Sequence, residues 1–160
     1  MKRLFTIGVY GWDLDSFLTA LERSGVRLLL DVRQRRGVRG REYAWANAVR
    51  LQAALTAAGV AYRHHKELAP TTELRHLQYA EDARVGVGKR SRVELAPVYR
   101  DGYTREILDD IELAPIVEAL PRQDASALLC VERDPEACHR SLIAERIADQ
   151  HEVVVSHLRP

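Results

Sequence analysis

The 160-residue sequence has little cysteine and no long hydrophobic run, and both absences limit what the protein can be. No apolar stretch approaches the roughly 20 residues that cross a membrane, and residues 1–7 lack the long apolar region of a signal peptide. We therefore expect a cytoplasmic protein with no membrane partner. In that reducing compartment its two cysteines should be free thiols, used for packing, metal binding or chemistry rather than for a disulfide.

Internal repeats, low-complexity linkers and the common nucleotide-binding motifs are also absent. The segment Gly8-Val9-Tyr10-Gly11 lacks the third glycine and the spacing of a dinucleotide fingerprint, and the chain contains no P-loop. Hydrophobic residues at 46% and charged residues at 29% fit a globular protein of ordinary composition. The length suits one domain with a core of normal size, so we expect a single domain over residues 1–160.

Apolar strands alternate with amphipathic helices along most of the chain. We expect strands over residues 4–10, 26–32, 60–65, 125–131 and 153–157, and helices over residues 13–24, 44–58, 103–120 and 135–150. Continuous apolar strands separated by helices indicate a parallel sheet that is covered on both faces. The prediction is an α/β fold, a three-layer Rossmann-like domain with a mainly parallel sheet of about five strands. Residues 69–102 are expected to form a long, basic middle segment without an assigned role.

The stretch from Cys130 to Arg140 is predicted to be the turn between a buried strand and a helix. Asp134 before Pro135 suggests an N-cap followed by proline at the first helical position. Cys138, His139 and Arg140 would then lie in the first turns of the helix, where the partial positive charge favours an anion and lowers the pKa of a thiol. The candidate catalytic residues, for proton transfer or nucleophilic work, are Glu132, Cys138 and His139.

The same residues have a plainer interpretation. Cys130 and Cys138 can be buried small hydrophobic residues, and His139 can be a histidine at the edge of the core beside Ile143 and Ile147. A zinc site made by both cysteines and His139 has suitable ligand types. However, the seven residues between the cysteines and two neighbouring ligands on one helix do not match the usual structural spacings. We therefore predict no metal and no cofactor.

Two basic loops interrupt the alternation of strands and helices. Residues 33–41 contain five arginines and no acid, and residues 84–92 contain Lys89 and three arginines, again without an acid. The net charge of the whole chain is only +1, so the charge is segregated rather than abundant. Solvated surface loops are one interpretation. Arginine also binds phosphate bidentately, which makes four residues candidate phosphate ligands: Arg33, Arg35, Arg36 and Arg140.

Ligands of open parallel sheets bind beyond the carboxyl ends of the strands, so these loops should border one rim. The rim requires the strand beginning near Ala125 to run parallel to the strand beginning near Val26. His65 and Glu67 follow another strand and share a face, because successive strand residues point to opposite sides. Glu67 therefore joins the candidate ligand-binding residues.

Several short motifs of the chain resemble one known family. They are Thr6-Ile7-Gly8, Leu30-Asp31-Val32-Arg33, Glu67-Leu68, and Cys130-Val131-Glu132 with Cys138-His139-Arg140-Ser141. Over nearly the whole chain they resemble the bacterial and archaeal family called domain of unknown function 488. That family usually has Gly-His-Ser near its start, where this chain has Gly8-Val9-Tyr10. The chemistry of the family is unsettled, so the resemblance implies a fold and a site rather than a reaction.

Two classes of function follow from these features. The first is an enzyme with a phosphate-binding pocket at the rim of the sheet, acting on a nucleotide or nucleic acid. The second is a non-catalytic nucleic-acid-binding module that uses the arginine-rich loops. A glutamate and a cysteine at a strand exit favour the enzyme, because a protein that binds only the phosphate backbone has no use for them. Loop charge that extends beyond a pocket favours the binding module.

Overall fold

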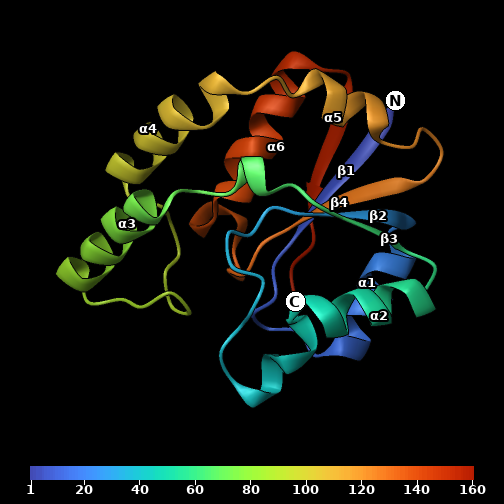
Figure 1. Ribbon diagram of the computed structural model, residues 1–160, viewed down its shortest axis with the longest axis horizontal. Helices are drawn as coiled ribbons and strands as arrows, with labels where there is room; N and C mark the ends of the chain where they lie inside the picture. Colours follow the sequence, from blue (N-terminus) through green and yellow to red (C-terminus); the bar gives the residue numbers. More distant parts are fainter.

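The computed structural model describes residues 1–160 and contains a five-stranded, all-parallel sheet with helices on both faces (Figure 1). The strands are β1 (Lys2–Ile7), β2 (Val26–Asp31), β3 (Ala61–His64), β4 (Ala125–Leu129) and β5 (Val153–His157). Their order across the sheet is β3-β2-β4-β1-β5. The α/β, Rossmann-like prediction is confirmed, and so is the parallel pairing of β2 with β4, in which Leu30 lies opposite Leu128.

One or more helices or short 3-10 turns lie between each pair of successive strands. They are α1 (Leu14–Arg23), η1 (Arg41–Ala46), α2 (Ala48–Ala57), η2 (Lys66–Leu68), α3 (Thr72–Val85), α4 (Pro97–Glu106), η3 (Leu108–Asp110), α5 (Ala114–Ala119), η4 (Pro135–Ala137) and α6 (His139–Gln150). Helix α1 begins as its sequence predicts, because Asp13 and Ser16 form a reciprocal capping box. No helix combines the length and the apolar character needed to cross a membrane.

Hydrophobic cores cover the two faces of the sheet. Successive residues of β2 alternate between them, so that Leu29 joins one core while Leu28 and Leu30 join the other. Phe17 of α1 and Leu51 of α2 pack in the first core. The second core holds the buried hydrophobic residues of α3, α4, α5 and α6. Burial of both faces explains why the strands are continuously apolar.

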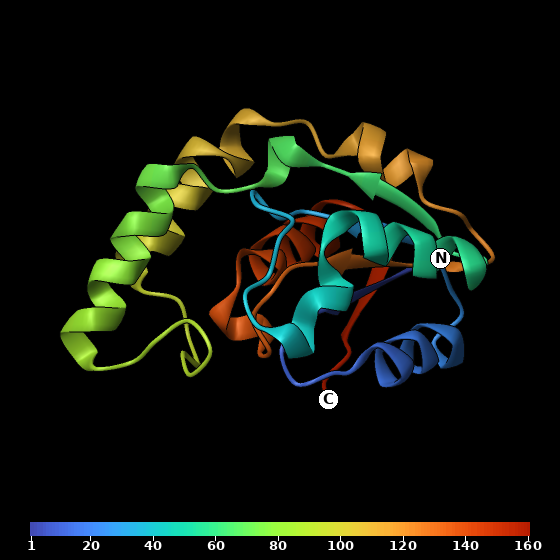
Figure 2. The same ribbon diagram turned by 60° about the horizontal axis from the view of Figure 1, so that its bottom comes forward.

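The middle segment, residues 69–102, contains a helix that the hydrophobic pattern did not predict. Helix α3 begins after Thr71, which caps it, and lies beside α4 at one side of the sheet (Figures 1 and 2). Its buried positions, four residues apart, are Leu74, Gln78 and Asp82. Two of these three are polar, so the helix has no apolar stripe that a sequence pattern could reveal.

The single helix expected over residues 103–120 was wrong. Helix α4 starts earlier, at Pro97, where proline suits the first helical position, and ends at Glu106. The turn η3 and the short helix α5 follow separately. Pro115 lies in the first turn of α5, since inside a continuous helix its ring would clash with the preceding turn.

Candidate functional site

The site lies at the carboxyl end of β4, in the turn that leads to α6. The predicted helix over residues 135–150 is divided: η4 ends at Ala137, Cys138 is extended (φ −142°, ψ 144°), and α6 begins at His139. Asp134 occupies the N-cap position of η4 and Pro135 its first helical position, as predicted, but the Asp134 side chain makes no capping hydrogen bond. Cys138 therefore precedes the helix, and its extended backbone separates it from η4. His139 is the first residue of α6.

Arg140 holds this turn in shape. Its side chain is completely buried, and it donates hydrogen bonds to the carbonyl oxygens of Glu132 (2.7 Å) and Arg133 (3.1 Å). Gly8, just beyond β1, approaches the same place so closely that an added Cβ would lie 1.9 Å from the Glu132 carbonyl oxygen. Only glycine fits there. The structure thus places Arg140 in the support of the turn, with its guanidinium directed at backbone carbonyls.

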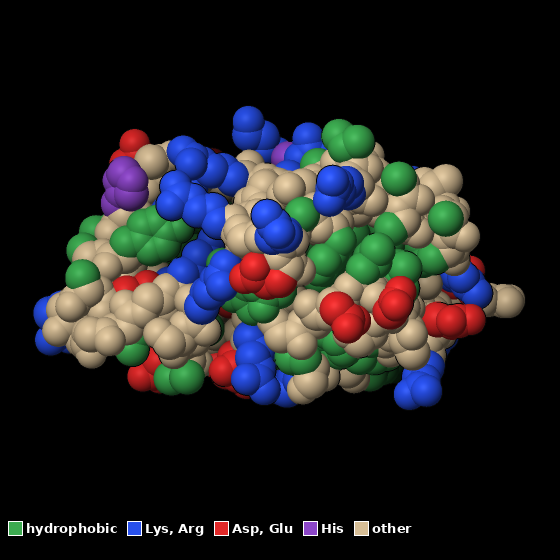
Figure 3. Space-filling model, turned by 90° about the horizontal axis from the view of Figure 1, so that it is seen from below, with side chains coloured by type: hydrophobic (Ala, Val, Ile, Leu, Met, Phe, Trp, Pro, Cys, Tyr) green, Lys and Arg blue, Asp and Glu red, His purple; other side chains and the backbone are tan.

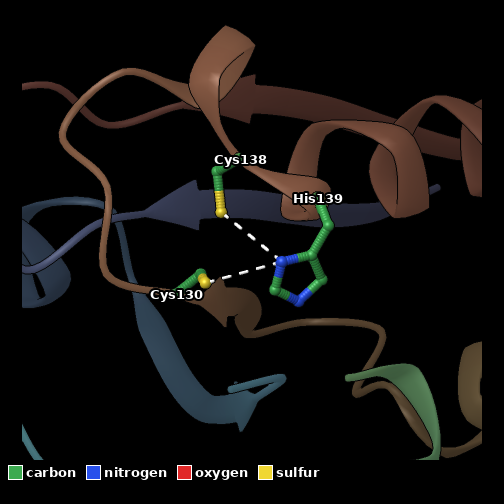
Figure 4. A group of neighbouring side chains, drawn as sticks. All are labelled: Cys130, Cys138 and His139. Atoms are coloured by element: carbon green, nitrogen blue, oxygen red, sulfur yellow. Dashed lines mark hydrogen bonds between the residues drawn. The ribbon is translucent and has the colours of Figure 1, made fainter. Parts of the chain in front are cut away.

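The turn brings Cys130, Cys138 and His139 together (Figure 4). The Nδ1 atom of His139 lies 3.7 Å from the Cys130 sulfur and 3.8 Å from the Cys138 sulfur. Its Nε2 atom lies 2.8 Å from the carbonyl oxygen of Val32, just beyond the end of β2. All three side chains are buried, and both cysteines are free thiols. Both cysteines are therefore buried, as the simpler interpretation predicted. Their sulfurs, however, lie close to titratable groups.

The electrostatics of this cluster favour one thiolate. Burial alone would raise the pKa of Cys138, but its hydrogen bond with Cys130 and the positive charges of Arg140 and His139 hold that pKa well below the ordinary value. The direction of this shift agrees with the lowered pKa that the sequence predicted. Burial and the neighbouring Cys138 raise the pKa of Cys130 well above its usual range. Burial opposes a charged His139, yet Cys138 raises its pKa.

Glu132 is also buried and belongs to a network that joins the turn to the middle segment. The guanidinium of Arg92 bridges two carboxylates, with Nη1 at 2.6 Å from Asp82 of α3 and Nη2 at 2.9 Å from Glu132. The second oxygen of Glu132 lies 3.4 Å from the sulfur of Cys130. Burial and the nearby Cys138 raise the pKa of Glu132, while Lys89 and Arg92 oppose that shift. This network docks α3 against the site.

A second buried network uses Arg33. Its guanidinium forms a bidentate pair with Asp31, at 2.9 and 2.8 Å, and donates to the carbonyl oxygen of Ala46 at 2.9 Å. Tyr62 donates to the same carboxylate at 2.5 Å, and Arg36 donates to the Tyr62 hydroxyl at 3.3 Å. The charge of Arg33 is therefore neutralised by Asp31, two residues earlier in the chain. This ion pair fixes the start of the arginine-rich loop.

Both networks border a cavity of about 780 Å³ at the carboxyl ends of the strands. It lies between the loop over residues 33–41, helix α3, the loop that follows α3, and the β4–α6 turn. Glu132 is the one acidic residue in its lining, against seven lysines and arginines: Arg33, Arg35, Arg39, Arg75, Lys89, Arg90 and Arg92. Figure 3 shows a band of lysine and arginine side chains across this side of the molecule. The cavity is therefore strongly cationic.

Four of these cations have no acidic partner: Arg35, Arg39, Arg75 and Lys89. Arg75 instead donates to Gln34 and Tyr79, and Arg35 and Arg39 are exposed. Burial opposes the charge of Lys89, but the carboxylate of Glu132 keeps its pKa above the usual value. No ion pair neutralises the charge of these four groups.

The structure separates the predicted site residues into two sets. Those in the cavity lining are Arg33, Arg35, Glu132, Cys138 and His139. Those outside it are Arg36, Arg140 and Glu67. Glu67 is exposed, and the hydrogen bond that its carboxylate accepts from His65 at 2.6 Å holds its pKa below the usual value.

Helix α3 supplies lining residues that the sequence did not predict. Arg75, His76, Gln78 and Tyr79 all border the cavity. Arg75 and Tyr79 lie one helical turn apart, and the guanidinium of Arg75 lies 5.6 Å from the centre of the Tyr79 ring. This i, i+4 pair of an arginine and a tyrosine was the available signal, but it is meaningful only once the segment is known to be a helix.

Comparison with known proteins gives one match. The family model described as Domain of unknown function DUF488 matches residues 13–147, which include the arginine-rich loop, α3 and the turn with Cys130, Cys138 and His139. No curated protein and no solved structure matches the chain. The matched region covers most of the sequence and contains every residue of the cluster at the strand exit. The chain belongs to the DUF488 family.

Proposed function

We propose that the protein is an enzyme that acts on a phosphate-bearing substrate, a nucleotide or nucleic acid, bound in the cationic cavity. One observation supports this above the others. Arg35, Arg39, Arg75 and Lys89 face the cavity without acidic partners, while the reactive side chains in the same lining are buried. Anions bind where unpaired arginine and lysine side chains converge, and arginine can hold phosphate with two parallel hydrogen bonds.

The reactive groups of the proposed enzyme are Glu132, Cys138 and His139. A carboxylate, a thiol and an imidazole in one buried turn can transfer protons or attack an electrophile, and exclusion of water strengthens each electrostatic interaction. Simple binding of a phosphate backbone does not need such a set. The same chemistry requires reduced thiols, so the proposal also locates the protein in a reducing compartment such as the cytoplasm.

A second candidate is a nucleic-acid-binding module without catalysis. It is supported by the basic side chains that continue outside the cavity. Arg41 is exposed at the end of the arginine-rich loop and is not part of the cavity lining. An extended polynucleotide could follow the band of basic side chains in Figure 3 and contact several of them at once.

Ligand binding is tested with inorganic phosphate, nucleoside phosphates and short RNA and DNA, by titration calorimetry at two salt concentrations. The double variant Arg35→Gln, Arg39→Gln should weaken binding. It should also make the slope of log K against log salt concentration less steep, by about 0.7–0.9 for each phosphate contact that is lost. Arg50→Gln is the matched control, because Arg50 is exposed on α2 and lies outside the cavity. Absence of binding to every probe at low salt would refute both candidate functions.

Turnover separates the enzyme from the binding module. The wild type and Glu132→Gln are incubated with each bound probe, and products are detected by chromatography and mass spectrometry. For an enzyme, Glu132→Gln should keep the affinity and lose the product, because a group used mainly in the transition state affects rate more than binding. Tight binding without any product in the wild type would favour the binding module.

A further inference from the structure

Three of the buried side chains have the arrangement of metal ligands. The two sulfurs of Cys130 and Cys138 and the Nδ1 atom of His139 all lie within 4.8 Å of one another. In a tetrahedral zinc site, with Zn–S bonds of about 2.3 Å and a Zn–N bond of about 2.1 Å, sulfur and nitrogen are about 3.6 Å apart. The two sulfur–nitrogen distances are 3.7 and 3.8 Å. Both therefore agree with a shared zinc ion to within a few tenths of an ångström.

The hydrogen bonding of His139 supports the same conclusion independently. Its Nε2 atom lies 2.8 Å from the carbonyl oxygen of Val32, which can only accept, so Nε2 carries a proton. In the neutral ring Nδ1 is then unprotonated, and Figure 4 shows that it points at both sulfurs. Metal-binding histidines usually donate their other ring N–H to a carbonyl or carboxylate, which fixes the tautomer and the ring orientation.

The backbone explains why residue spacing did not predict this site. Structural zinc motifs place their ligands on short knuckles or on helices, and Cys138 was expected to lie on the same helix as His139. The extended conformation of Cys138 instead interrupts the chain between η4 and α6. The thiol and the adjacent imidazole then face one point, beside the thiol at the end of β4 (Figure 4).

We propose that Cys130, Cys138 and His139 bind one zinc ion whose fourth coordination position opens to the cavity, where it accepts water or an oxygen of a phosphate-bearing ligand. All three residues line the cavity, and two thiolates with one imidazole and an open position form a known catalytic zinc set. Two thiolates balance the charge of the ion, so the surrounding cations still attract an anion. Zinc takes the place of the protons on the sulfurs. The ligand class rests on the proposed function, whereas the metal site does not.

The metal site is tested on the whole protein, with Co²⁺ as a spectroscopic probe and Zn²⁺ as its competitor. The wild type should bind one equivalent of Co²⁺, with visible d–d absorption of a tetrahedral site and a near-ultraviolet thiolate-to-cobalt charge-transfer band. Zn²⁺ should abolish both signals and protect both thiols from alkylation. A folded wild type without a charge-transfer band at one equivalent would overturn the proposal.

Variants locate the site. Cys130→Ser and Cys138→Ser should each remove about half of the charge-transfer intensity. Each should also weaken Zn²⁺ binding at least about 100-fold, because loss of a residue that only hydrogen-bonds to a ligand already lowers metal affinity about 10–100-fold. His151→Asn, at the far end of α6, is the control and should bind normally. Circular dichroism checks that each variant is folded. A charge-transfer band that survives both cysteine changes would refute the assignment.

The outcome for the metal is distinct from the outcome for the proposed function. Metal binding with no affinity for phosphate, nucleotides or nucleic acid would support the zinc site and refute the substrate class. Nucleotide turnover by a protein that binds no Zn²⁺ or Co²⁺ would support the proposed function and overturn the zinc site. In that case Cys138 and His139 act directly as reactive groups. With zinc bound they serve as its ligands, and Glu132 is the group left for proton transfer.

Discussion

Replacing Arg92 should destabilise the protein more than replacing an exposed arginine. The side chains of Arg92, Asp82 and Glu132 are 5%, 6% and 9% exposed, and the guanidinium bridges both carboxylates. The change Arg92→Met leaves two buried acids without the guanidinium that pairs with both. Breaking a buried pair by removing one partner costs about 3–5 kcal/mol, and we expect a loss of this size in the free energy of unfolding. Lys89 offsets part of the charge on Glu132, which limits the loss.

The measurement is urea unfolding followed by circular dichroism. Arg84→Met is the matched control, because the side chain of Arg84 is 69% exposed and pairs with Glu81 on the surface of α3. Its loss should cost less than about 1 kcal/mol. The triple change Arg92→Met, Asp82→Asn, Glu132→Gln should recover much of the stability, because no buried carboxylate remains without a counterion. An Arg92→Met variant as stable as the control, or a triple variant no better than Arg92→Met, would refute the reasoning.

Two further predictions concern the support of the turn. Gly8→Ala should lower the free energy of unfolding by about 1–3 kcal/mol, because its Cβ would overlap the carbonyl oxygen of Glu132. Gly88→Ala is the control. Its Cβ would meet no atom within 4 Å, so the change should be close to neutral in the same urea titration. Arg140→Met should cost at least about 2 kcal/mol, because the carbonyl oxygens of Glu132 and Arg133 each lose a charged donor. Thermal unfolding of Arg140→Met at the wild-type temperature would contradict the supporting role.

The sheet could be predicted from the sequence because its strands are buried on both faces. Leu28, Leu29 and Leu30 form a continuous apolar run, and a parallel strand covered on both faces buries consecutive residues in this way. The exit of β4 could also be located, since the polar residues follow an equally apolar strand. The division between η4 and α6 could not, because an extended residue at Cys138 leaves no mark in composition or periodicity.

Charge alone could not identify which arginines are available to a ligand. Arg33 and Arg35 belong to the same loop, yet Arg33 is 1% exposed and paired with Asp31, while Arg35 is exposed and unpaired. Asp31 is the last residue of β2 and Arg33 follows two residues later. Residues i and i+2 of an extended chain point to the same side, so this spacing was a usable signal. Arg140 gave no such signal. Its partners are backbone carbonyls, which every sequence contains.

The contacts that hold the walls of the cavity together differ in strength. Arg92 anchors the middle segment to the β4–α6 turn through buried ion pairs, which fix the position of α3. Arg90 joins the same segment to η1, which follows the arginine-rich loop, through Glu42 at 3.1 Å and the ring of Tyr43 at 5.2 Å on the surface. Exposed contacts of these kinds contribute about 1 kcal/mol or less each. The inner wall is therefore rigid and the outer edge is weakly held. An anion between the unpaired cations of the two loops would reduce their repulsion and strengthen that edge.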